Sequence, residues 1–173
     1  MVSANGEPGR VRPMREEDLE RVLGWRNHED VRRYMYTRHE ISLAEHRAWF
    51  ARSSQDASRH LLVFERAGVP LGFINLHVIA AGGIADWGFY AAPDAPRGTG
   101  RSLGCAALEH AFRNLGLHRL YAQALAYNER SICFHLSLGF CQEGILRSHH
   151  FDGEQYHDVV CFGLLASEWH AQP

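Results

Sequence analysis

The amino-acid sequence predicts a single α/β domain in which helices pack against a β-sheet. The length of 173 residues suits one domain with a sizeable hydrophobic core. Apolar residues recur at helical spacing in some segments and form short runs between turn residues in others, so helices and strands are expected to alternate. Near the middle of the chain, a glycine-rich turn over 97–104 joins a predicted strand to a predicted amphipathic helix.

The N-terminal third of the chain is predicted to be mainly helical. The small and polar residues of 1–10 predict a disordered tail, which leaves 11–170 as the domain. Ser42, with Glu45 three residues later, has the spacing of a capping box and predicts the start of a helix. The elements expected here are a strand over 11–14 and three helices, one opening at 15–18, one within 27–36 and one from 42.

From His60 onward the apolar pattern changes to one typical of strands. Two apolar runs flank Ala67 and Gly68, which predicts a hairpin, and Gly82-Gly83 predicts a turn before the next strand. The elements expected here are strands over 61–64, 70–78, 84–90, 119–125, 140–146 and 155–165, with helices after the 97–104 turn and over 129–138.

The 97–104 turn has the sequence expected of a phosphate-binding loop. A strand, a tight turn and a helix start expose unpaired backbone N–H groups at the positive end of a helix dipole. Gly98 and Gly100 let a ligand approach the backbone, because neither carries a Cβ. The turn lacks the lysine of a P-loop, and its glycines miss the spacing of a dinucleotide fingerprint by one residue. An ordinary turn is the alternative.

Through Arg97, Gly100 and Ser102, the turn resembles the Arg-x-x-Gly-x-Gly/Ala pyrophosphate loop of the GNAT N-acetyltransferases. The resemblance implies acetyl-CoA as the acetyl donor. In that family a strand edge pairs with the pantetheine arm, and the loop N–H groups hold the pyrophosphate. The donor-binding residues it implies here are Phe89, Tyr90, Arg97, Gly98, Thr99, Gly100, Arg101, Ser102 and Asn128. A solvated surface is the alternative for the two arginines.

A second motif supports the same resemblance. Asn128 and the pair Gly139-Phe140 match the Asn and Gly-Phe positions of the family in register. His135 stands where the family usually has a tyrosine, which often protonates the leaving sulfur. The resemblance implies a mixed sheet whose central strands splay apart, with helices on both faces, and the predicted order of elements agrees with that fold.

Acetyl transfer needs a neutral amine, a polarised thioester carbonyl and a proton for the departing thiolate. His135 is the candidate proton donor, since a reference pKa of about 6.5 lets it donate to a thiolate of about 8.5. The alternative is a histidine that packs beside the donor without transferring a proton. A backbone N–H after Trp87 is the candidate for polarising the carbonyl. Glu129, His46 and a water chain remain alternatives for the base.

The acceptor side resembles GNAT enzymes that acetylate the 4-amino group of a UDP-linked 4-amino-4,6-dideoxy sugar on the pseudaminic acid pathway. The similarity covers roughly residues 11–169 and includes the segments 25–27, 31–32, 35–36, 41–42, 46–50, 86–90, 128–129 and 151–158. The substrate-binding residues it implies are Arg26, Met35, Tyr36, His46, Trp49, Trp87 and Tyr90. Arg26 and His46 would hold a phosphate or uracil oxygen, and Trp87 would stack on the base. Ordinary core packing is the alternative for the apolar members.

Two other functions stay open. A ribosomal-protein-type N-terminal alanine acetyltransferase is one, and a non-catalytic acyl-CoA-binding module is the other. Residues 25–50 carry more arginine and histidine than acid, which favours a nucleotide-linked acceptor over a peptide.

Composition sets further limits. The net charge of −2 and the short apolar runs give no indication of a nucleic-acid or membrane partner. The four cysteines have no C-x-x-C spacing and three lie in apolar segments, so reduced core thiols in a cytoplasmic protein are expected. No metal-binding motif occurs, and no metal site is predicted. The oligomeric state is left open, with a homodimer as one alternative.

Overall fold

The computed structural model describes residues 9–170, whose strands form a seven-stranded sheet in the order β1-β2-β3-β4-β5-β7-β6. β4 and β5 run parallel, and the other neighbouring strands are antiparallel, so the predicted mixed sheet is confirmed. The strands are β1 (Arg10–Pro13), β2 (Arg59–Arg66), β3 (Val69–Ala80), β4 (Ile84–Ala91), β5 (Arg119–Leu125), β6 (Cys141–Phe151) and β7 (Tyr156–Leu165).

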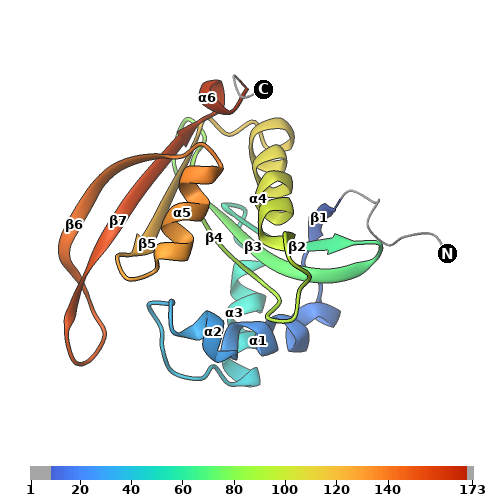
Figure 1. Ribbon diagram of the computed structural model, residues 1–173. Helices are drawn as coiled ribbons and strands as arrows, with labels where there is room; N and C mark the ends of the chain where they lie inside the picture. The colour runs from blue at the N-terminus through green and yellow to red at the C-terminus, as the bar shows by residue number, and fades with distance from the viewer. Residues whose placement is uncertain (1–8, 171–173) are drawn as a thin grey trace.

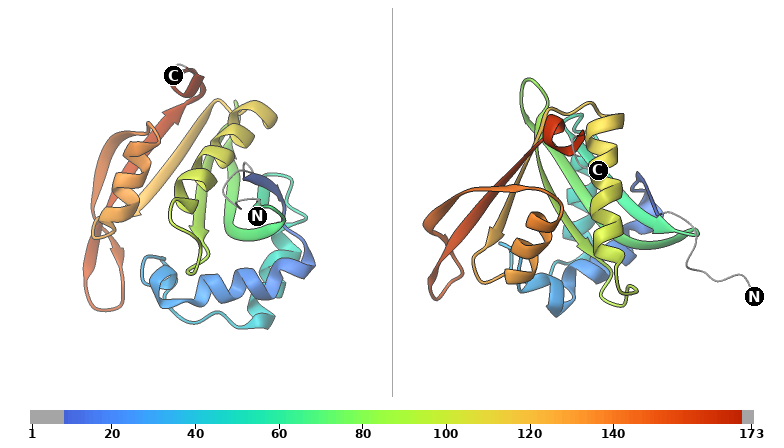
Figure 2. Two further views of the ribbon diagram at one scale, coloured as in Figure 1. Left: turned by 45° about the vertical axis from the view of Figure 1, so that its right-hand side comes forward. Right: turned by 45° about the horizontal axis from the view of Figure 1, so that its top comes forward.

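The helical elements lie on both faces of the sheet. They are the 3-10 turn η1 (Glu16–Asp18), α1 (Leu19–Asn27), α2 (Glu29–Arg32), α3 (Leu43–Ser53), α4 (Thr99–Glu109), its π-helical continuation η2 (His110–Asn114), α5 (Glu129–Ser137) and α6 (Ala166–His170). Figures 1 and 2 show α4 and α5 on one face and α1 to α3 on the other.

Strand alternation divides the buried side chains into two cores. The larger core lies against α4 and contains Trp87, with Phe89 packed against it. The second core lies against α1 and contains Phe73, with Tyr90 packed against it. Because successive strand side chains point to opposite faces, Gly88 lies on the same face as Tyr90. We refer to the two sides of the sheet as the α4 face and the α1 face.

The centre of the sheet opens between β4 and β5. The two strands are paired only from Ile84 to Asp86 on β4, and Asp86 faces Tyr121 of β5 in the last pair. β5 stays paired with β7 as far as Leu125, while within residues 9–170 no strand pairs with this edge of β4 beyond Asp86. The predicted splay of the central strands is confirmed, and we call this opening the fork.

Local signals placed most elements correctly. Ser42 Oγ accepts a hydrogen bond from the Glu45 N–H at 3.1 Å and caps α3, as the sequence predicts. Ala67 and Gly68 have positive φ values of 50° and 76° in the β2–β3 hairpin turn. Three differences stand out: α2 is only four residues long, β6 continues to Phe151, and α6 was not predicted.

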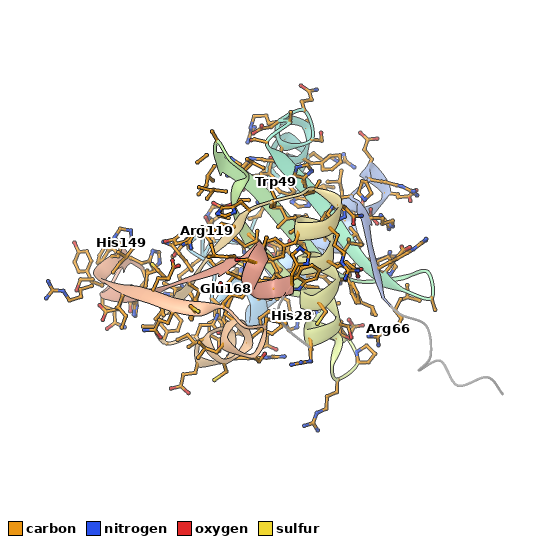
Figure 3. The ribbon with its side chains drawn as sticks, turned by 90° about the horizontal axis from the view of Figure 1, so that it is seen from above. His28, Trp49, Arg66, Arg119, His149 and Glu168 are labelled. Atoms are coloured by element: carbon orange, nitrogen blue, oxygen red, sulfur yellow. The ribbon has the colours of Figure 1, made fainter. Side chains whose placement is uncertain are left out.

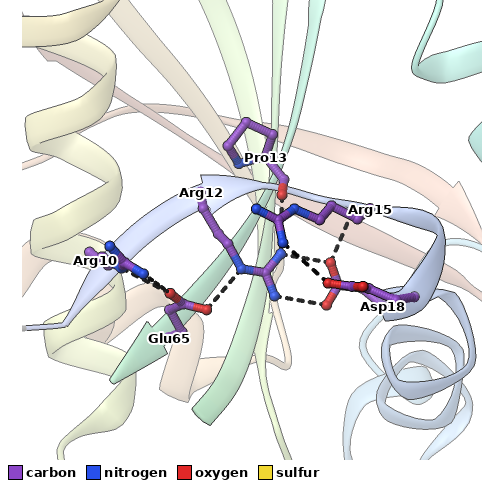
Figure 4. Close-up of polar contacts among 7 residues, drawn as sticks. Arg10, Arg12, Pro13, Arg15, Asp18 and Glu65 are labelled. Carbon is purple, nitrogen blue, oxygen red and sulfur yellow. Dashed lines mark hydrogen bonds and ion pairs between the residues drawn. The ribbon is translucent and has the colours of Figure 1, made fainter. Parts of the chain in front are cut away.

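The predicted tail over 1–10 lies mostly outside the described residues, but Arg10 begins β1. In Figure 4, Arg12 of β1 joins two buried carboxylates. It donates from Nη1 to Asp18 Oδ2 at 2.7 Å and from Nε to Glu65 Oε2 at 2.8 Å. Asp18 is 2% exposed and Glu65 5% exposed, so this ion-pair network fixes β1 and η1 against β2.

The prediction of core cysteines is wrong for three of the four residues. Cys105, Cys133 and Cys141 are exposed on outward-facing positions, and Cys161 is buried. All four thiols are free. Over 9–170, the structure contains no helix with both the length and the apolar character needed to cross a bilayer.

Candidate active site

The loop before α4 has unused backbone donors. Gly98 adopts a left-handed conformation with φ 89° and starts the helix, and Thr99 Oγ1 donates to the Pro96 carbonyl at 2.7 Å. Among the described residues, the N–H groups of Gly100 and Arg101 have no acceptor, as expected for a first helical turn. A Cβ at Gly100 would meet only the Phe134 ring, at 3.9 Å, so the loop is open above this position. These features fit a pyrophosphate.

Three arginines surround this loop, and sequence reasoning missed one of them. Arg97 and Arg101, both predicted, are exposed. Arg66, at the end of β2, donates from Nη2 to Ser102 Oγ at 2.9 Å. In Figure 3 Arg66 lies on the α4 side of the molecule. The two residues lie 36 positions apart in the sequence, and no local sequence pattern predicts their contact.

The free edge of β4 continues from the loop into the fork. Phe89 points to the α4 face, where its ring lies 4.8 Å from that of Phe134. Tyr90 points to the α1 face, 5.3 Å from Phe73. The backbone between them has no β5 partner and is available to an extended chain such as pantetheine. The loop and the edge together therefore fit acetyl-CoA, which supplies the activated acetyl group as a thioester.

His135, the predicted proton donor, is buried on the α4 face with 2% exposure. Its Nδ1 lies 2.7 Å from the Ser131 carbonyl, and its Nε2 accepts the Trp87 indole N–H at 3.1 Å. Since a carbonyl only accepts, the ring proton is on Nδ1 and Nε2 has none to give. Burial lowers the pKa of His135. This geometry favours the packing alternative over proton donation.

Trp87 does not lie where stacking on a substrate base would require. It is 7% exposed on the α4 face, and its ring stacks on Phe140 at 5.2 Å. The acceptor residues predicted beside it are on the opposite face, because side chains alternate along β4. This position favours core packing for Trp87, and its predicted role at the acceptor stays a prediction.

Arg26 remains on the acceptor side, at the end of α1. Its Nη2 donates to the Thr37 carbonyl at 2.9 Å, whereas Nη1 is buried and has no hydrogen-bond partner within 9–170. Burial lowers the pKa of Arg26, and the Tyr90 side chain is close enough to interact with it electrostatically. Burial in turn raises the pKa of Tyr90.

His46 and Trp49 pack together above β3. The His46 ring stacks on Trp49 at 5.0 Å, and Trp49 meets Phe73 edge-on at 5.9 Å. His46 is 4% exposed, its Nε2 has no partner among the described residues, and burial lowers its pKa. The neutral ring suits a base, but it is enclosed in the second core. This position favours packing for both residues.

The segment after α2 crosses to the far side of the fork. Tyr36 Oη donates to Gln123 Oε1 at 2.9 Å, and Gln123 Nε2 donates to Tyr121 Oη at 2.7 Å. Tyr121 Oη donates in turn to Cys161 Sγ at 3.2 Å. Sequence reasoning found Tyr36 but missed the β5 residues, which alternate with buried apolar positions. Met35 lies next to Tyr36 and is half-buried.

The residues at the start of α5 lie at the end of β5. Asn128 Oδ1 accepts the Ser131 N–H at 3.1 Å, so its side chain is used to cap the helix. Glu129 is exposed. Glu129 belongs to α5, not to β4 and not to the α1-face residues that surround the fork. Its predicted role as the base stays a prediction.

The family model and the relatives that this chain matches are all acetyltransferases. Residues 10–141 match the family model described as an acetyltransferase (GNAT) domain. The acetyltransferase PseH of Campylobacter jejuni subsp. jejuni serotype O:23/36 (strain 81-176) is 28% identical over 119 residues, which are 67% of this chain and 72% of that protein. The spermidine N(1)-acetyltransferase of Escherichia coli (strain K12) is 26% identical over 169 residues, 94% of this chain and 89% of that protein.

A solved structure of similar fold carries ligands. It is the spermidine N-acetyltransferase from Vibrio cholerae in complex with CoA and spermine. The TM-score is 0.86 at 24% identity, and the match covers 94% of this chain and 98% of that one.

Proposed function

The chain belongs to the GNAT acetyltransferases and transfers an acetyl group from acetyl-CoA to an amine, and we propose that its acceptor is a UDP-linked 4-amino-4,6-dideoxy sugar acetylated at the 4-amino group. Transfer takes place with both substrates bound, the donor in the fork and the acceptor on the α1 face.

The observation that carries this choice is the buried Nη1 atom of the half-buried Arg26 side chain. A buried guanidinium nitrogen without a hydrogen-bond acceptor is costly, and Arg26 Nη1 has no hydrogen-bond partner within 9–170. Arg32 adds to the positive potential at Arg26, whereas the negative charge of Glu45 opposes it. A diphosphate or a uracil oxygen would supply the missing acceptor, with a charge-assisted hydrogen bond to the planar guanidinium. The tyrosine side chains of Tyr36 and Tyr90 line the same face.

A polyamine acceptor is the second candidate. The similarity to spermidine N(1)-acetyltransferase covers 94% of this chain, more than the 67% covered by the PseH match. Spermidine is a polycation, however, and its binding calls for carboxylates where this chain buries an arginine. The charge at Arg26 therefore supports the nucleotide sugar.

Release of free thiol from acetyl-CoA tests the assignment. The enzyme is assayed with UDP-4-amino-4,6-dideoxy-N-acetylaltrosamine, with spermidine and with a peptide that starts with alanine, at matched concentrations. The proposal predicts the highest kcat/KM for the sugar and inhibition of that reaction by UDP. A higher kcat/KM for spermidine, without inhibition by UDP, would replace the sugar with a polyamine.

A further inference from the structure

A recess lies at the C-terminal end of α3, on the α1 face of the sheet. Its volume is about 280 Å³, and it is lined by Trp49, Arg52, Ser53, Asp56 and Arg59. This volume is close to the lower end, about 300 Å³, of the range found for small-molecule sites. Because Arg59 begins β2, the recess lies where the end of α3 meets the sheet.

Two polar side chains of this recess have no partner. Ser53 is 7% exposed, yet its hydroxyl makes no hydrogen bond within 9–170. The Arg52 guanidinium is exposed and forms neither a hydrogen bond nor an ion pair with any described residue. In contrast, Arg59 Nε lies 3.4 Å from Asp56 Oδ2, so these two charges offset each other. The recess therefore offers a sheltered hydroxyl and an uncompensated cation to a ligand.

A row of side chains connects the recess to the fork. Arg59 of β2 is in register with His77 of β3, and His77 with Asp86 of β4, the last β4 residue paired with β5. Residues directly opposite each other in an antiparallel ladder share a face, here the α1 face. Two strand spacings, about 10 Å, separate Arg59 from Asp86. A diphosphate and one sugar ring are long enough to bridge this distance.

The fork end of this row is open. Gly88 lies on the same face as Asp86 and is exposed, and a Cβ built on it would meet no atom within 4 Å. Its partner on β3 is Asn75, whose Oδ1 is buried and has no hydrogen-bond partner within 9–170. A hydroxyl or amine of a bound sugar would supply the missing donor. Space for a sugar therefore lies beside the strand edge that fits the pantetheine arm.

We propose that the recess binds the uridine of the acceptor, with the diphosphate at Arg26 and the sugar above Gly88. This inference rests on the proposed nucleotide-sugar acceptor and assigns the base and ribose of that acceptor to the end of α3. The pyrimidine ring packs against Trp49. The Arg52 guanidinium donates to the carbonyl oxygen at position 4 of uracil, and the Ser53 hydroxyl hydrogen-bonds to the ribose.

Arg26 lies within reach of the same ligand. The His46 ring stacks on Trp49 at 5.0 Å, and Trp49 lines the recess. Arg26 is close enough to His46 to act on it electrostatically. Arg26, His46 and Trp49 thus follow one another toward the recess, and a diphosphate at Arg26 leads directly to a nucleoside beside Trp49.

The charges around the recess favour a nucleoside over a phosphate. Ser53 is the last residue of α3, and the C-terminal end of a helix carries a partial negative charge. Asp56 adds a carboxylate. Both favour hydrogen-bond donors, which uracil supplies at N3 and ribose at its hydroxyls. A polyamine has donors too, but it has no acceptor for Arg52 and no ring to pack against Trp49.

Calorimetric titration with UMP and with CMP tests the recess. The wild-type enzyme should bind UMP more tightly, because cytosine has an amino group at position 4, which does not accept a hydrogen bond from Arg52. Arg52→Gln should weaken UMP binding by about 10-fold and remove the preference for UMP over CMP. Since the Arg52 side chain has no partner within 9–170, this variant should keep the melting temperature of the wild type.

Initial rates give a second measurement. UMP should compete with the sugar nucleotide and not with acetyl-CoA. Arg52→Gln should raise KM for the sugar nucleotide while kcat stays near the wild-type value, because the uridine contact is the same in the ground state and in the transition state. Arg47→Gln removes another exposed arginine of α3, serves as the matched control and should keep both the UMP affinity and this KM.

The variants separate a failure of this inference from a failure of the proposed function. If Arg52→Gln and Ser53→Ala bind UMP as tightly as the wild type, while Arg26→Gln weakens UDP binding, the uridine lies elsewhere. The recess assignment is then overturned and the nucleotide-sugar acceptor stands. If the wild-type enzyme binds neither UMP nor UDP, the nucleotide-sugar acceptor is wrong, and the recess assignment falls with it.

Discussion

The indole N–H of Trp87 donates to Nε2 of His135 across 3.1 Å and joins β4 to α5 beside the fork. The other ring nitrogen of His135 lies 2.7 Å from the Ser131 carbonyl, and the ring stacks on Phe162 at 5.1 Å. Every polar atom of this imidazole is therefore in use. These contacts favour a His135 that holds the edge of β4 in position over one that delivers a proton.

Replacing His135 with phenylalanine should destabilise the fold. The substitution leaves the buried Trp87 N–H without an acceptor, which costs about 1–3 kcal/mol. Urea denaturation at pH 7 measures the loss. The double variant His135→Phe/Trp87→Phe removes both polar partners. Its loss of unfolding free energy should be smaller than the sum of the losses in the two single variants.

The same variant should respond differently to pH. Because burial lowers the pKa of His135, the unfolded chain binds its proton more readily than the folded chain. This part of the stability is present above the unfolded pKa of about 6.5 and is lost as the pH falls through the folded pKa. The gap in unfolding free energy between wild type and His135→Phe should therefore narrow on acidification. An unchanged gap, or a shifted alkaline limb in the kcat profile, would contradict the neutral structural role.

Arg26→Gln tests the acceptor site. Loss of a hydrogen bond from a charged group, about 1.5–3 kcal/mol, should raise KM for the nucleotide sugar by roughly 10-fold to 100-fold. KM for acetyl-CoA should stay near the wild-type value, and Arg47→Gln, at an exposed position of α3, serves as the control. For a polyamine the sign reverses, because removing a buried cation would lower KM. The direction of the change therefore decides between the two acceptors.

Gly100→Ala should weaken donor binding without unfolding the enzyme. The nearest atom to a new Cβ is 3.9 Å away, so the protein itself accommodates alanine. A pyrophosphate bound to the loop N–H groups would approach too closely. We expect a higher Kd for acetyl-CoA by calorimetry with the melting temperature retained. Gly24→Ala in α1, also with open space, is the control and should leave this Kd unchanged.

The sequence could predict what depends on neighbouring residues. The bounds of β5, the Ser42 cap and the glycine loop follow from local patterns, and all three are present. The last part of β6 was missed because its residues are polar and exposed, and it is held by the ladder to β7. An edge strand of that kind carries no apolar alternation.

The functional faces were less accessible to sequence reasoning. Trp87 was assigned to the acceptor because its neighbours suggested a ligand, whereas strand alternation turns it toward α5. Its contact with His135 spans 48 residues. Asn75 belonged to no motif, and only the β3–β4 register places it beside the open Gly88. Chemistry that depends on which face a side chain occupies needs the register of the sheet.

The Arg12 ion-pair network predicts how the stability of the fold changes in acid. Hydrogen bonds from Arg12 and from Arg10 lower the pKa of Glu65. Burial alone would raise the pKa of Asp18, but hydrogen bonds from Arg12 and the Arg15 N–H lower it. Arg12→Ala removes the ion-pair partner of buried Asp18, while Glu65 keeps its ion pair with Arg10, and should cost about 3–5 kcal/mol at pH 7. Arg15→Ala removes only an exposed pair with Glu17 and should cost less than about 1 kcal/mol.

The pH dependence of that loss identifies its cause. Carboxyl groups with lowered pKa values contribute stability above their unfolded pKa values of about 4, and this contribution is lost as the pH falls through the folded values. In Arg12→Ala, Asp18 is buried without its ion-pair partner, so protonation of Asp18 relieves the buried charge, while Glu65 keeps its pair with Arg10. Urea midpoints of wild type and Arg12→Ala should therefore converge between pH 5 and about pH 3. Parallel midpoints over this range would mean that Arg12 acts by packing, and that its charge contributes nothing to the network.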